Sequence, residues 1–150
     1  MSRTQRDMNC SVDDVYAILQ DGWLYPLWVV GASRVRDVDD SWPDVGARIH
    51  HSIGAWPLLL NDTTSVTDCR PGRSLSLRAR AWPAGEAQVV IELESLPDGG
   101  CRVTITEDAA KGPGRLIPAP IRTPLLHQRN VEALRRLSYV AEGRAMVPVG

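Results

Sequence analysis

The chain has 150 residues, of which 43% are apolar and 23% are charged, and its formal net charge at pH 7 is -1. This length suits one domain with a substantial core, and the absence of a basic excess argues against nucleic acid or an anionic membrane surface as a partner. The polar N-terminus and the short apolar runs predict a cytoplasmic protein without membrane insertion. The three cysteines have no zinc-binding spacing, so we expect no metal or cofactor.

The N-terminal part of the sequence predicts one strand and two short helices. Residues 3–9 form a short polar segment that favours a strand. Ser11 is followed by acidic residues, the arrangement of a helix N-cap and first turn, and helical spacing of apolar residues continues until Gly22. Residues 23–29 are apolar but contain a proline, which predicts a short second helix or a turn.

From residue 32 to about residue 106 the pattern is mostly that of strands. Segments such as RIHHSIG (48–54) and SLSLRARAW (74–82) place side chains of similar polarity two residues apart, as a half-buried strand requires. The intervening sequences AWPL, RPGR, PAGE and PDGG are typical of turns. We therefore predict about six consecutive antiparallel strands, with one apolar face that needs a cover.

The C-terminal part predicts one long helix. Residues 109–124 contain repeated Gly and Pro, so we expect no long helix through them. The segment LLHQRNVEALRRLSYVAEG (125–143) predicts a helix of about five turns that stops at Gly143. One stripe of this helix faces the sheet and contains Leu126, Asn130, Leu134, Leu137 and Ala141.

The order of these elements resembles the SRPBCC (START-like, polyketide cyclase/dehydrase) superfamily. The resemblance is carried by SVDDVYAILQDGWLYPLWVVGASRV (11–35), HHSIGAWPLLLNDTTSV (50–66) and RNVEALRRLSYVAEG (129–143). It implies a single α+β domain, residues 1–150 with a core of about 3–142, with the helix-grip fold. In that fold a curved antiparallel sheet of about six to seven strands wraps around a long C-terminal helix, with two short helices after the first strand. It also implies an apolar cavity between sheet and helix, whereas the activity does not follow from the fold.

The adjacent residues His50 and His51 should point to opposite faces of their strand. If AWPL is a tight turn, His51 lies opposite Asp62 and both point inward, while His50 faces solvent with Arg48 and Ser52. An inward carboxylate could fix the tautomer of His51 and raise its pKa, which would suit a general base. The structural alternatives are a neutral hydrogen-bonded pair or an aspartate that holds a turn or bulge.

A second group of candidates is expected to line the cavity. Trp28 and Trp56 are placed to stack on an aromatic ligand at its rim, or to pack in the core. Asn130 needs a polar partner, either a ligand or a backbone group. Arg129 belongs to the solvated face of the terminal helix, and His127 is expected near its solvated start. The full predicted lining is Trp28, Ile49, His51, Ile53, Trp56, Leu60, Leu77, Val89, Ile91, Ile105, Asn130 and Leu134.

Three functions are compatible with this sequence. The first is a protein, monomeric or homodimeric, whose partner is a small hydrophobic or aromatic molecule bound in the cavity. The second is a polyketide cyclase/dehydratase-type enzyme that uses His51 and Asp62 for acid/base chemistry. The third is a regulatory or stress-related protein without a ligand.

Overall fold

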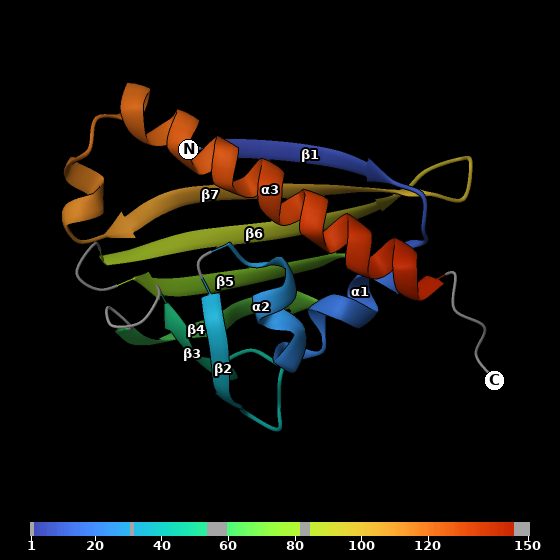
Figure 1. The fold of residues 1–150 in the computed structure, drawn as a ribbon, viewed down its shortest axis with the longest axis horizontal. Helices are drawn as coiled ribbons and strands as arrows, with labels where there is room; N and C mark the ends of the chain where they lie inside the picture. The colour runs from blue at the N-terminus through green and yellow to red at the C-terminus, as the bar shows by residue number, and fades with distance from the viewer. Residues whose placement is uncertain (1, 31, 54–59, 82–84, 146–150) are drawn as a thin grey trace.

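A curved antiparallel sheet and one long helix dominate the fold (Figure 1). The structure, a computed structural model, describes residues 2–30, 32–53, 60–81 and 85–145. Along the chain the elements are β1 (Ser2–Met8), α1 (Val12–Leu19), η1 (Gly22–Leu24), α2 (Tyr25–Trp28), β2 (Ala32–Val38), β3 (Arg48–Ile53), β4 (Leu60–Arg70), β5 (Ser74–Ala81), β6 (Gly85–Ser95), β7 (Cys101–Lys111), η2 (Pro113–Leu116) and α3 (Ala119–Ala145).

The strands form one sheet in the order β1-β7-β6-β5-β4-β3-β2, and every neighbouring pair is antiparallel. Helix α3 crosses one face of this sheet, and the short helices α1 and α2 lie beside it (Figure 1). This arrangement is the α+β helix-grip fold, and it confirms the predicted fold class. Within the described part of the chain, no helix combines the length and the apolar character needed to cross a membrane.

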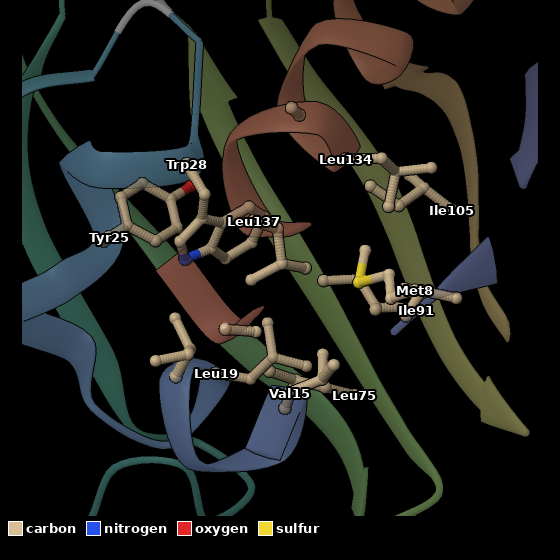
Figure 2. Close-up of a cluster of buried hydrophobic side chains, with 14 of the residues drawn as sticks. Met8, Val15, Leu19, Tyr25, Trp28, Leu75, Ile91, Ile105, Leu134 and Leu137 are labelled. Atoms are coloured by element: carbon tan, nitrogen blue, oxygen red, sulfur yellow. The ribbon is translucent and has the colours of Figure 1, made fainter. Parts of the chain in front are cut away.

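The core lies between the sheet and the three helices, where alternate residues of the strands point inward (Figure 2). Leu75 on β5 and Ile91 on β6 are almost completely buried, and they face Leu137 of α3 within one hydrophobic cluster. Each such side chain contributes about 1.5–3 kcal/mol on burial. The expected N-cap of α1 is confirmed, because Ser11 and Asp14 form a capping box.

Three predicted boundaries are wrong. Strand β7 continues to Lys111, and α3 begins at Ala119 and extends past Gly143 to Ala145. Pro120 is tolerated because it lies in the first turn, where backbone N–H groups have no intrahelical partner. Pro124 lies inside the helix and removes one backbone hydrogen bond, a loss that a helix of 27 residues can absorb.

Gly22 does not end α1, as the sequence had indicated, since that helix ends at Leu19. Gly22 instead begins η1 at a point of close packing. A Cβ atom at this position would lie 2.7 Å from Cγ1 of Val38. The glycine therefore allows η1 to approach the end of β2.

Candidate functional site

A pocket of about 150 Å³ lies between the inner face of the sheet, α2 and α3. Most of its wall is apolar and includes Trp28, Leu77, Val89, Ile105 and Ala133. The polar side chains that line it are Tyr25, His51, Arg80, Glu107, Arg129 and Asn130. These residues come from α2, β3, β5, β7 and α3, so the pocket depends on the packing of the whole fold.

The residues predicted to line a cavity fall into three groups. Those that line this pocket are Trp28, His51, Leu77, Val89, Ile105 and Asn130. Ile49, Ile91 and Leu134 do not line it and pack instead in the hydrophobic core. Trp56 lies outside the described residues. Ile53 and Leu60 are paired in the β3–β4 register, but their side chains are not among the described parts of the structure.

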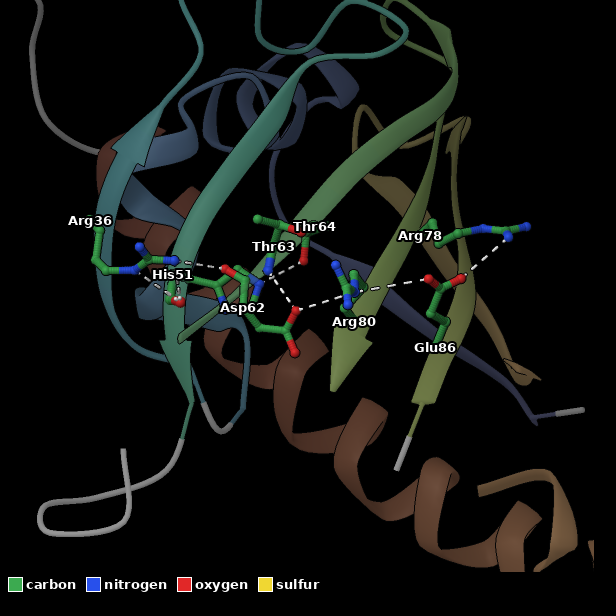
Figure 3. A network of polar contacts seen from close by, with 8 residues as sticks. All are labelled: Arg36, His51, Asp62, Thr63, Thr64, Arg78, Arg80 and Glu86. Carbon is green, nitrogen blue, oxygen red and sulfur yellow. Dashed lines mark hydrogen bonds and ion pairs between the residues drawn. The ribbon is translucent and has the colours of Figure 1, made fainter. Parts of the chain in front are cut away.

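The predicted hairpin register is present, and it places His51 directly opposite Asp62. Both residues are buried, with 2% and 6% of their surface exposed. The imidazole, however, is hydrogen-bonded through Nε2 to Oγ1 of Thr64 at 2.9 Å (Figure 3). The hydroxyl of Tyr25 lies 3.0 Å from the same Oγ1 atom, and the Tyr25 ring stacks on the imidazole with centroids 5.4 Å apart.

The Asp62 carboxylate is oriented by other groups. Its Oδ1 atom accepts a hydrogen bond from the backbone N–H of Thr63 at 2.9 Å and lies 3.7 Å from Nε of Arg80 (Figure 3). Arg36 extends from the neighbouring strand β2, and its Nη2 donates to the Asp62 carbonyl oxygen. The Asp62 carboxylate therefore lies near His51, but the hydrogen bond at Nε2 of the imidazole joins it to Thr64 and not to Asp62.

The charge of Asp62 acts on the pKa of His51 in the predicted upward direction, but the net shift is downward. Burial disfavours the imidazolium and lowers the pKa below its ordinary value of 6.5, and the opposing effect of the Asp62 charge is smaller. Arg36 and His50 lower the pKa further. His51 is therefore a neutral imidazole at pH 7.

The sequence interpretation missed an ion pair in the pocket wall. Glu107 is only 3% exposed, and its carboxylate pairs with the guanidinium of Arg129 on α3. Arg129 therefore reaches from the helix to a buried carboxylate, rather than lying only on the solvated face as predicted. A signal was present in the sequence, because Val103, Ile105 and Glu107 are two residues apart and share the inward face of β7.

Two buried polar atoms of pocket residues have no hydrogen-bond partner among the described residues. They are Nδ2 of Asn130 and Nδ1 of His51. Asn130 is 4% exposed, so water outside the protein does not reach it freely. Leaving a buried donor or acceptor unpaired costs about 1–3 kcal/mol. Of the two alternatives for Asn130, a backbone group is therefore not observed as the partner of Nδ2 in the part of the chain that the structure describes.

Tyr25 is a further pocket residue that the sequence interpretation did not select. Burial raises the pKa of its hydroxyl to about 12, and the hydrogen bond to Thr64 partly opposes this effect. The hydroxyl is therefore protonated at neutral pH. It can take part in a hydrogen-bonded chain that runs from Tyr25 through Thr64 to His51.

The other polar candidates have structural partners. His50 is half-buried, and its Nε2 lies 3.3 Å from Oδ1 of Asp39. Ser52, which was predicted to face solvent, is buried. His127 is exposed but lies well inside α3, where its Nδ1 is hydrogen-bonded to Oγ1 of Thr4. Among the described residues there is no cluster of His, Cys, Asp or Glu that could hold a metal ion.

Solved structures with the same architecture are numerous, although no protein-family model and no curated protein matches the sequence. Protein NE0264 from Nitrosomonas europaea is 16% identical, with a TM-score of 0.68 over 95% of this chain and 94% of its own. Ara h 8.0201 is 13% identical, with a TM-score of 0.69 over 96% and 95%. DynU16, from the dynemicin biosynthetic locus, is 19% identical, with a TM-score of 0.67 over 95% of this chain and 47% of its own. These likenesses show a shared fold.

Proposed function

We propose that this protein belongs to the SRPBCC superfamily and binds a small hydrophobic or aromatic molecule in the pocket between the sheet, α2 and α3. The observation that carries the proposal is that two side chains lining a mostly apolar pocket, Asn130 and His51, each have a buried polar atom without a hydrogen-bond partner among the described residues. Buried polar groups in folded proteins nearly always have partners, and a bound ligand would supply them. Burial of the ligand's apolar surface would contribute about 25 cal/mol per Å² before ordering costs.

The size of the pocket restricts the ligand. An apolar cavity of about 150 Å³ in another protein accommodates benzene, and the pocket here has a similar volume of about 150 Å³. The aromatic ring of Trp28 contributes to its wall and offers a surface for stacking. The pocket therefore has room for a single aromatic ring with small substituents.

A second candidate function is a cyclase or dehydratase-type reaction on a polyketide-like substrate. Its support is the neutral imidazole of His51, a residue that lines the pocket and whose Nδ1 atom has no hydrogen-bond partner among the described residues. A fold shared with a protein of the dynemicin biosynthetic locus is compatible with it. In this mechanism His51 moves the proton and the charge of Asp62 stabilises the imidazolium, since the carboxylate raises the pKa of His51.

Native mass spectrometry of the purified protein tests the binding function. We expect an additional mass, of one small organic molecule, on the wild-type chain or after incubation with single-ring compounds. The variant Ala133→Phe fills the pocket and should lose that mass. The matched variant Val131→Phe adds the same ring to an exposed position on the same helix and should keep it. A mass retained equally by both variants, or absent from the wild type under all conditions, would exclude this pocket as the binding site.

The enzymatic function is separated from binding by His51→Gln. If the protein is an enzyme, turnover of a short poly-β-ketone thioester should be lost in this variant while the substrate still binds. Binding without turnover by the wild type, across a series of such substrates, would argue for the carrier function alone.

A further inference from the structure

We infer that the pocket selects uncharged ligands with a carbonyl or hydroxyl oxygen that accepts a hydrogen bond from Asn130, and that the Glu107–Arg129 pair discriminates against carboxylates. This inference rests on the proposed binding function, because it concerns which ligands the same pocket accepts. It assigns Asn130 the role of recognising the ligand's oxygen. It assigns the ion pair the role of keeping the pocket closed to anions.

The first step concerns the donor. Asn130 lies on the face of α3 that is turned toward the sheet, and it lines the pocket while being almost completely buried. Its Nδ2 atom carries hydrogens and has no acceptor among the described residues. Ala133 follows three residues later on the same face and also lines the pocket, so its small side chain leaves room for a ligand beside the amide.

The second step concerns charge. Both arginines that line the pocket already face carboxylates, Arg129 the buried Glu107 and Arg80 the buried Asp62. A ligand carboxylate would have to displace Glu107 from Arg129, or lie next to one of these two buried carboxylates. Two carboxylates this close repel each other, which lowers the affinity of the pocket for a charged ligand. An uncharged ligand neither displaces Glu107 nor brings a second negative charge close to a carboxylate.

The third step concerns His51, the other unpaired group. Burial keeps its imidazole neutral at pH 7, so it adds no positive charge that could attract an anion. His51 belongs to the sheet side of the pocket, on β3, whereas Asn130 belongs to the helix side, on α3. A neutral ligand that spans the two can pair with both without bringing a charge into the pocket.

The test compares three single-ring probes on the intact protein by ligand-observed NMR titration. Acetophenone carries a carbonyl, ethylbenzene has a similar shape without the oxygen, and benzoate carries a charge. We expect the wild type to bind acetophenone more tightly than benzoate. Asn130→Leu, which removes the donor and keeps a similar volume, should reduce the ratio of acetophenone to ethylbenzene affinity about tenfold, the value of one good hydrogen bond. Val131→Leu, on the exposed face of α3, should leave both affinities as they are.

Two measurements do not depend on the folding of that variant. In the wild type, the side-chain amide resonances of Asn130 should shift with acetophenone and not with ethylbenzene. Glu107→Gln removes the carboxylate that engages Arg129, so the ratio of benzoate to acetophenone affinity should rise about tenfold.

The outcomes distinguish the inference from the function on which it rests. The inference would be overturned, and ligand binding left in place, by either of two results. One is that the Asn130 amide resonances do not shift with acetophenone, and the other is that benzoate binds the wild type as tightly as acetophenone. If neither acetophenone nor ethylbenzene binds at millimolar concentration, both the inference and the proposed function fail.

Discussion

The Nε2 atom of His51 lies 2.9 Å from Oγ1 of Thr64, although the residue directly opposite His51 in the sheet is Asp62. The imidazole is therefore held by a neutral hydroxyl and by the stacked ring of Tyr25, inside a buried environment. Two effects compete at this site, because burial disfavours the imidazolium and the nearby carboxylate favours it. Burial is the larger effect, so the histidine at the pocket is a neutral hydrogen-bonding group at pH 7.

The competition can be measured by NMR titration of the imidazole signals. We expect the pKa of His51 to lie below 6.5 in the wild type, and Asp62→Asn to lower it further because the carboxylate that favours the charged form is gone. Asp13→Asn, an exposed change on α1, serves as the control and should leave the titration as it is. A wild-type pKa at or above 6.5, or a rise in Asp62→Asn, would contradict this account.

The same shift predicts how stability depends on pH. A histidine whose pKa is lower in the folded state than in the unfolded state binds fewer protons when folded, so stability falls as pH decreases below 6.5. The full contribution of His51 to the free energy of unfolding is present above that pH. Each pH unit below it removes at most about 1.4 kcal/mol of this free energy. His51→Gln keeps a polar side chain and should show a shallower loss of the free energy of unfolding between pH 7 and pH 5. Urea unfolding at several pH values measures this, and parallel profiles for both proteins would refute it.

Much of the fold was predictable because its determinants are local. The period-two pattern of Leu75 and Leu77, together with short turn sequences, defines strands that pair with their neighbours along the chain. The same argument predicted the register that places His51 opposite Asp62. A strong local pattern determines such features, and distant residues only reinforce them.

The parts that sequence reasoning missed depend on contacts between distant elements. The partners of His51 are set by Tyr25, which reaches Thr64 from a helix 39 positions earlier in the chain. The role of Arg129 depends on a carboxylate on β7 that the same helix covers. The early start of α3 also runs against a local rule, since prolines usually exclude a helix and here fall in its first turns. Periodicity within one segment carries no information on such contacts.

The Glu107–Arg129 pair predicts an asymmetric effect of mutations. Arg129→Met leaves a buried carboxylate without its partner and should cost about 3 kcal/mol or more. Glu107→Gln leaves Arg129 unpaired, and that side chain is 43% exposed and can turn to water, so we expect a clearly smaller loss. The double variant should recover much of the stability lost in Arg129→Met. Urea unfolding of the four proteins measures this cycle, and equal losses in the two single variants would show that Glu107 is not desolvated as the structure indicates.

Two glycines in different surroundings, Gly143 inside α3 and Gly100 before β7, are predicted to respond in opposite ways to replacement by alanine. At Gly143, inside the helix, an added Cβ would meet no atom within 4 Å, so Gly143→Ala should stabilise the protein by about 0.5–1 kcal/mol through the higher helix propensity of alanine. At Gly100 an added Cβ would lie 2.6 Å from the carbonyl oxygen of Met8, and Gly100→Ala should cost about 1–3 kcal/mol. Chemical denaturation measures both changes in stability, provided that the m-values of the variants equal that of the wild type. A loss of stability in Gly143→Ala would instead indicate that this glycine ends the helix, as the sequence pattern alone predicts, because a left-handed C-terminal position penalises alanine.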